Sequence, residues 1–240
     1  MPKERGLETR VALVPTVLPT LLEAGWSVLV ERGAGFAAGY PDHTFEAHGA
    51  RITDAAGLRD ADVLVGVRLG AASADPGALE RTLRPGTTLV GIAEPLADPR
   101  LIAELAEAGL TLYALDLLPR ISRAQSMDVL SSQSTVTGYK AAVLSAAALP
   151  KLFPMLTTAA GTVPPAEVLV IGAGVAGLTA IATARRLGAV VQGYDVRPAA
   201  QEEIESVGAR AVLLPLQPGD AEDASGYAKD LGDQFERRQQ

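Results

Sequence analysis

The sequence predicts an α/β protein built from two Rossmann-like domains, each with a parallel sheet. Short β-branched runs alternate with helical segments along most of the chain, as in parallel sheets covered by helices on both faces. The 240 residues are more than one ordinary domain needs and suit two. A glycine-rich turn in the second half follows a predicted strand and precedes a predicted helix.

The elements of the first domain are predicted from short apolar segments that begin or end at proline or glycine. Pro15 suits the first turn of a helix and Gly25 suits the residue after its end. Applied along the chain, the same reasoning predicts helices at residues 15–22, 41–48, around 79 and at 99–108, and strands at 27–30, 62–67, 88–92 and 110–115.

The second domain follows a polar, irregular stretch at residues 119–134. We expect the boundary inside that stretch, which divides the chain into residues 1–125 and 126–240. Beyond it we expect a long alanine-rich helix at 138–148, a bridge at 151–161, strands at 167–171, 190–194 and 211–214, and helices at 175–187 and 199–207.

Both domains look incomplete. No apolar strand precedes Pro2, so the first strand of the first domain is expected to be missing. The chain ends at Gln240, although a doubly wound dinucleotide domain uses a second βαβ half after its first three strands. The sequence therefore predicts a chain truncated at each end, with only the first βαβαβ half of the second domain.

Composition narrows the function classes. The net charge of −7 argues against non-specific nucleic-acid binding, and the lack of cysteine excludes disulfides and thiolate chemistry. No run approaches about 18 apolar residues, so no direct membrane span is expected. His43 and His48 lie five residues apart on a predicted short helix, where solvated histidines are favoured over a metal site. A cytoplasmic setting is compatible with these features.

The glycine loop Gly172-Ala173-Gly174-Val175-Ala176-Gly177 predicts dinucleotide binding. In its strand–turn–helix context Gly172 suits the tight turn, Gly174 close approach of the pyrophosphate, and Gly177 close packing of helix on strand. The free N–H groups at the start of the helix would face the phosphates. The alternative is a glycine-rich turn that binds no ligand.

Asp195 ends the next predicted strand, where the dinucleotide fingerprint has an acid for the adenosine ribose. A carboxylate there repels a 2′-phosphate and favours NAD over NADP, although the nearby Arg197 could accommodate that phosphate. We place Asp195 and the adjacent Val196 at the cofactor. The alternative for Asp195 is a solvated loop acid.

Polar residues crowd residues 120–133, after a predicted parallel strand. Arg120, Gln125 and Asp128 can donate or accept hydrogen bonds around a ligand, but none forms a nucleophile with an activating base. The set suits binding and orientation; the alternative is a solvated linker with helix-capping serines. Tyr227 lies in a polar stretch that indicates a flexible loop, and composition alone would make it a stray exposed tyrosine.

On these residues the chain resembles the NAD(H)-binding component, or alpha subunit, of proton-translocating NAD(P) transhydrogenases, relatives of alanine dehydrogenase. The resemblance is dense over residues 119–133, 155–177 and 189–197, and looser before residue 110. The run Arg120-Ile121-Ser122-Arg123-Ala124-Gln125-Ser126-Met127-Asp128 is highly specific to these transhydrogenases, and so is the segment at residues 157–165 when it is read with the glycine loop.

The resemblance implies a function and site roles. Hydride would pass from NADH on this component to NADP on a partner component, coupled to proton movement through a membrane-spanning component. Arg120, Gln125, Asp128 and Ser131 would orient the dihydronicotinamide and its ribose. Asp195 would hold the adenosine ribose, and Tyr227 would lie on a mobile loop that closes over the nucleotide. A homodimer, peripheral on the cytoplasmic side of the inner membrane, is also implied.

Two alternatives remain. An alanine dehydrogenase uses a lysine and a histidine of its first domain, but the corresponding places here hold Val67-Arg68 and Gly91. Arg10, which that enzyme uses for the substrate carboxylate, is present in both families. The other alternative is a truncated, non-catalytic fragment with a partial dinucleotide site.

Overall fold

A computed structural model describes residues 1–70, 73, 75 and 79–213. The chain forms two compact units, Met1–Asp128 and Val129–Gln240, which are considered one at a time. The boundary expected between residues 125 and 126 falls within the 3-10 helix Ser122–Met127, just before the division.

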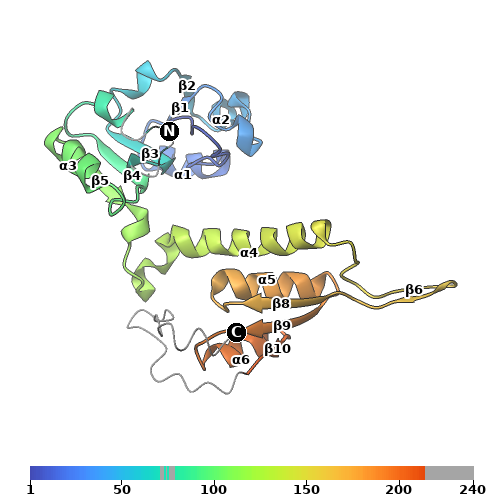
Figure 1. Cartoon of the computed structure of the whole chain (residues 1–240). Coiled ribbons are helices and arrows are strands. Elements are labelled where there is room, and N and C mark those ends of the chain that lie inside the picture. The colour runs from blue at the N-terminus through green and yellow to red at the C-terminus, as the bar shows by residue number, and fades with distance from the viewer. Residues whose placement is uncertain (71–72, 74, 76–78, 214–240) are drawn as a thin grey trace. The chain divides into compact units, whose positions relative to one another are not determined.

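The first unit contains two parallel sheets (Figure 1). Strands β3 (Val63–Arg68), β4 (Thr88–Ile92) and β5 (Thr111–Ala114) lie side by side in that order. Strands β1 (Leu29–Glu31) and β2 (Arg51–Thr53) form a separate pair. The helices are α1 (Leu18–Glu23), α2 (Asp42–Ala47) and α3 (Pro99–Glu107).

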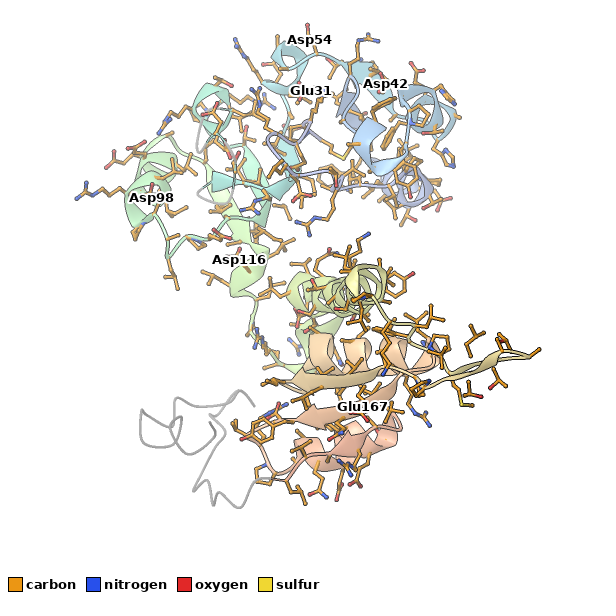
Figure 2. The ribbon with its side chains drawn as sticks, turned by 45° about the vertical axis from the view of Figure 1, so that its right-hand side comes forward. Glu31, Asp42, Asp54, Asp98, Asp116 and Glu167 are labelled. Atoms are coloured by element: carbon orange, nitrogen blue, oxygen red, sulfur yellow. The ribbon has the colours of Figure 1, made fainter. Side chains whose placement is uncertain are left out.

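Each sheet of the first unit has its own apolar core. Leu64, Leu89 and Leu105 are buried with the β3–β5 sheet, whereas Leu18, Val30 and Phe45 are buried with the β1–β2 pair. Helix α3 begins at a side-chain cap, because the Asp98 carboxylate accepts the Leu101 N–H at 3.1 Å (labelled in Figure 2).

The first four residues connect the two sheets of this unit. The Met1 ammonium group donates to the Leu29 carbonyl at 2.7 Å, and the Met1 carbonyl accepts the Glu31 N–H at 3.0 Å. The Glu4 carboxylate accepts the N–H groups of Val67 and Arg68, at 2.6 and 3.3 Å, where β3 ends.

The second unit contains a three-stranded parallel sheet and a helical layer. Strands β8 (Glu167–Ile171), β9 (Val190–Tyr194) and β10 (Arg210–Ala211) pair in the order β10-β9-β8. Helix α5 (Val175–Arg186) connects β8 to β9, and α6 (Ala200–Ser206) connects β9 to β10. The long helix α4 (Val129–Ala148) lies alongside α5 (Figure 1).

The predicted α/β class with parallel sheets is confirmed, and strands β4, β8 and β9 have the predicted bounds. Other expectations were wrong. Strand β2 was not expected, and an antiparallel hairpin, β6 (Leu156–Thr158) and β7 (Gly161–Val163), stands where a bridge was predicted. Helix α4 begins at Val129 rather than Gly138. Of the helix expected around Leu79, the described residues contain the 3-10 turn Glu80–Thr82, and residues 76–78 lie outside the described part of the chain.

Candidate dinucleotide site

The glycine loop begins where the β8–β9 ladder ends. Gly172 has φ of +92°, in the left-handed region that favours glycine, and its N–H donates to the Tyr194 carbonyl at 2.8 Å. The chain therefore turns sharply out of the sheet directly after Ile171, as the motif requires. The next residue, Ala173, is buried beneath the turn.

Gly177 and Gly174 are glycines for different structural reasons. A β-carbon on Gly177 would overlap the Gly172 carbonyl group, so only glycine lets α5 pack this closely on the turn. A β-carbon on Gly174 would meet nothing within 4 Å, and the φ of Gly174 is an ordinary −73°. Gly174 thus faces open space in front of the helix.

That open space adjoins the start of α5. Gly174 is the N-cap of α5, and no side chain caps the helix there. The first N–H groups of a helix have no partner within the helix and carry its positive partial charge. An anion in front of Gly174 would therefore meet both backbone donors and a favourable field.

Asp195 connects the glycine loop to the tip of β9. Its Oδ2 accepts the Ala173 N–H at 2.7 Å, and its Oδ1 accepts the backbone N–H of Arg197 at 2.8 Å. The Arg197 guanidinium adds hydrogen bonds to the same carboxylate at 3.0 and 3.2 Å. Only 8% of the Asp195 side chain and 16% of the Arg197 side chain are exposed.

This environment keeps Asp195 ionised. Burial favours the neutral acid, but the hydrogen bonds from the Arg197 side chain and from the Ala173 and Arg197 N–H groups outweigh it, so the pKa of Asp195 lies below its usual value. The carboxylate both holds the glycine loop through the Ala173 N–H and carries a negative charge at the tip of β9.

The structure brings together only some of the predicted site residues. Gly172, Gly174, Gly177, Asp195 and Val196 lie at one end of the β8–β9 sheet, Val196 in the bend that follows Asp195. Ser131 lies in the first turn of α4, in the same unit. Arg120 and Gln125, both exposed, and Asp128 belong to the end of the first unit. Tyr227 lies outside the described residues.

The carboxylates that contact the ends of β3 and β4, those of Glu4 and Asp116, were not singled out from the sequence. The Asp116 carboxylate accepts the N–H groups of Ala93 and Glu94 at 2.9 and 3.0 Å, as Glu4 does after β3 (Asp116 is labelled in Figure 2). Glu94 has φ of +46°. No local sequence signal marks such long-range carboxylate contacts.

Arg10 is engaged by a neighbouring acid. Its Nε and one terminal nitrogen donate to the two Glu8 oxygens at 2.8 and 2.7 Å. The hydrogen bond from Arg10 lowers the pKa of Glu8 to about 2. At Gly91, a β-carbon would overlap the Gly66 carbonyl, so this position leaves no room for a histidine side chain.

Neither a metal cluster nor a membrane-spanning helix occurs among the described residues. No group of three or more His, Asp or Glu side chains there could hold a metal ion. In the same residues, no helix combines the length and the apolarity needed to cross a bilayer.

Family models decide the relationship of this chain to known proteins. The model of the alanine dehydrogenase/PNT N-terminal domain matches residues 1–137, and that of the C-terminal domain matches residues 141–232. The chain belongs to the alanine dehydrogenase/PNT family. Its two matched regions cover nearly all of both structural units, the glycine loop included.

Within this family the chain is similar to transhydrogenase alpha subunits. It is 46% identical over 244 residues to an NAD(P) transhydrogenase subunit alpha of Rhodospirillum rubrum, covering 100% of this chain and 63% of that protein. Its structure matches a transhydrogenase from Sinorhizobium meliloti with a TM-score of 0.83 and 46% identity, over 88% of this chain and 62% of the other.

The alanine dehydrogenase branch is more distant. An L-alanine dehydrogenase structure matches with a TM-score of 0.72 and 27% identity, over 88% of this chain and 58% of the other. The resemblance to transhydrogenase inferred from the sequence is confirmed. The chain spans less than two thirds of the length of these relatives.

Proposed function

We propose that this chain binds NAD(H) at the glycine loop and serves as the NAD(H)-binding component of a proton-translocating NAD(P) transhydrogenase. The open space at Gly174, in front of the uncapped start of α5, carries the proposal because it accepts a pyrophosphate. The names of the relatives from Rhodospirillum rubrum and Sinorhizobium meliloti support the reaction.

NAD(H) is favoured over NADP(H) by the charge at Asp195. The carboxylate is buried and ionised, and its ion pair engages the Arg197 guanidinium. A 2′-phosphate placed here would face that negative charge and would compete for an arginine already paired. A ribose diol instead donates to the carboxylate. Val196 follows directly and contacts the adenosine in this proposal.

The nicotinamide is oriented by Arg120, Gln125, Asp128 and Ser131. The nicotinamide ring of NADH supplies a hydride, which passes to the ring of NADP on the partner component. Because the hydride passes directly from one nicotinamide ring to the other, the reaction requires no acid–base residue. The chain contributes by positioning the donor ring and by excluding water. Tyr227 lies on a loop that closes over the bound nucleotide.

The proposed assembly contains an NADP-binding component, a membrane-spanning component and a second copy of this chain. We propose the hairpin β6–β7 as a surface that contacts a partner. The hairpin extends away from the sheet (Figure 1), and the apolar side chains of Met155, Leu156 and Val163 are exposed there. The membrane-spanning component would hold the assembly on the cytoplasmic side of the inner membrane.

Nucleotide selectivity tests the binding site. We expect a fluorescence titration to show tighter binding of NADH than of NADPH, and Asp195→Asn to narrow that difference because it removes the charge that repels the 2′-phosphate. Arg186→Gln, a charge change at the far end of α5, serves as the control. Equal affinities of the unmodified protein for the two nucleotides would refute the assignment.

Hydride transfer tests the reaction. With the NADP-binding partner present, we expect Gln125→Asn to slow transfer far more than it weakens NADH binding, since Gln125 orients the ring. Gln201→Asn, a position on α6, is the matched control. A parallel loss of rate and affinity would make Gln125 a binding residue only. Robust alanine-dependent NADH production would favour an alanine dehydrogenase instead.

A further inference from the structure

Helix α4 makes an unusually close contact with the first turn of α5. A β-carbon on Gly138 would overlap the Ala176 carbonyl oxygen and would lie 2.9 Å from Cβ of Thr179. Gly138 is buried, and four residues later Ala142 is buried on the same face. Glycine at position 138 therefore lets the backbone of α4 rest directly against the start of α5.

The two helices run in the same direction. Gly138 meets Ala176, the second residue of α5. After α4 ends, the chain reaches Pro154, whose atoms lie 2.7 Å from a β-carbon built on Gly188, just beyond the end of α5. The start of α4 thus lies toward the start of α5, and its end toward the end of α5.

It follows that the first segment of α4 extends past α5. Val129 lies nine positions before Gly138, or about 13.5 Å at 1.5 Å per residue. Only Val175 precedes Ala176 in α5, so most of this length projects beyond the start of α5, on the side of the glycine loop. Figure 1 shows α4 continuing beyond α5 at this end.

The projecting segment presents serines on the face that contacts α5. Residues 131 and 134 are seven and four positions before Gly138, which places them on the same face of the helix. Other hydroxyls of this segment bond back to helix carbonyls: Ser132 to Val129, Thr135 to Ser131 and Thr137 to Gln133. Among the described residues, no partner takes up the Ser134 hydroxyl, and Ser134 is half-buried.

We propose that the Ser131–Ser134 face of α4 forms a wall of the pyrophosphate site, with Ser134 as a nucleotide-binding residue and Gly138 as its positioning residue. Ser134 donates its hydroxyl hydrogen to a phosphate oxygen held in front of Gly174. Gly138 sets the distance between that wall and the loop. This inference rests on the proposed binding of a dinucleotide at the glycine loop.

Two substitutions and two ligands test it. We expect Ser134→Ala to weaken NADH binding by about tenfold, as for one lost hydrogen bond to a charged group. Gly138→Ala must move α4 by roughly 1 Å and should weaken NADH binding by tenfold or more. Affinity for adenosine, which carries no phosphate, should change less than about twofold in both variants. Ser145→Ala, exposed on the same helix, is the control.

The outcomes separate the two proposals. Failure of the unmodified protein to bind NADH would overturn the proposed function and this inference together. NADH binding that both variants leave unchanged, or a parallel loss of NADH and adenosine affinity, would overturn only the role of α4. Thermal unfolding of each variant identifies a loss of NADH affinity that comes from misfolding. If Gly138→Ala fails to fold, Ser134→Ala still decides the test, because it removes only one oxygen from a half-buried site.

Discussion

Replacing Gly174 by alanine should separate ligand binding from stability. The added methyl group would meet no atom within 4 Å, and the backbone of Gly174 is extended with φ of −73°. The substitution therefore introduces no strain into the free protein. It also reduces the freedom of the unfolded chain, which stabilises the fold by roughly 0.4–1 kcal/mol. In the proposed complex, the same methyl group would stand where the pyrophosphate approaches the backbone.

Gly177→Ala supplies the matched contrast three residues away. Its β-carbon would overlap the Gly172 carbonyl oxygen and lie 2.8 Å from the carbonyl carbon, and both are backbone atoms that cannot rotate aside. Overpacking of this kind costs about 1–3 kcal/mol. We therefore expect Gly177→Ala to lower the free energy of unfolding, whereas Gly174→Ala leaves it unchanged or slightly raised.

Urea unfolding followed by circular dichroism measures the free energy of unfolding of each variant, and NADH titration measures its affinity for the nucleotide. We expect Gly174→Ala to weaken NADH binding at least tenfold, or about 1.4 kcal/mol, at full stability. NADH affinity within twofold of the unmodified protein would show that no ligand approaches Gly174. A loss of stability equal to that of Gly177→Ala would show that the space before Gly174 is filled.

Two further predictions concern the first unit. Asp98→Ala removes the cap of α3 and should cost about 1 kcal/mol in urea unfolding while NADH affinity stays the same; an unchanged midpoint would mean that the cap contributes nothing. Because the folded pKa of Glu8 is lowered to about 2 from an ordinary 4.5, its pairing with Arg10 stabilises the fold above pH 4.5, and that stability is lost as the pH falls toward 2. Glu8→Gln should flatten the dependence of stability on pH across this window, and an unaltered profile would assign the dependence to other acids.

Strong local signals made strands β8 and β9 and the glycine loop between β8 and α5 predictable. The runs at residues 167–171 and 190–194 are short and largely apolar, and both became strands with the expected ends. Gly172 has a positive φ, and Gly177 packs against the Gly172 carbonyl group, so both positions require glycine. At Gly174 a β-carbon would face open space. Local sequence carries this information because turn geometry depends on few residues.

The first half of α4 was not predictable from propensity. Residues 129–137 are rich in serine, threonine and glutamine, which compete with the helix through their own hydrogen bonds. In the structure, several of these hydroxyls donate hydrogen bonds to helix carbonyls one turn earlier. Their side-chain hydrogen bonds are therefore compatible with the helix and do not end it. The contact of Gly138 with α5 is tertiary and leaves no local pattern.

The hairpin β6–β7 and strand β2 were missed for a related reason. All six hairpin residues in the two strands are exposed, so no alternation of apolar and polar residues marks them. The hairpin is identified instead by its pairing, Leu156 with Val163 and Thr157 with Thr162. Strand β2 has three residues and pairs only with β1, a contact that depends on the rest of the unit.

At Asp195 the structure shows contacts that the sequence does not predict. The sequence identifies an acid at a strand tip, where it would bind a ribose. The structure adds that the carboxylate holds the Ala173 N–H and is paired with Arg197. In the proposed site, recognition of the ribose is therefore joined to the shape of the glycine loop, because the same carboxylate accepts the Ala173 N–H. In the proposed site a ribose hydroxyl that donates to Asp195 would share that carboxylate with the Arg197 guanidinium. We therefore expect Arg197 to influence affinity for NAD(H) without touching the nucleotide.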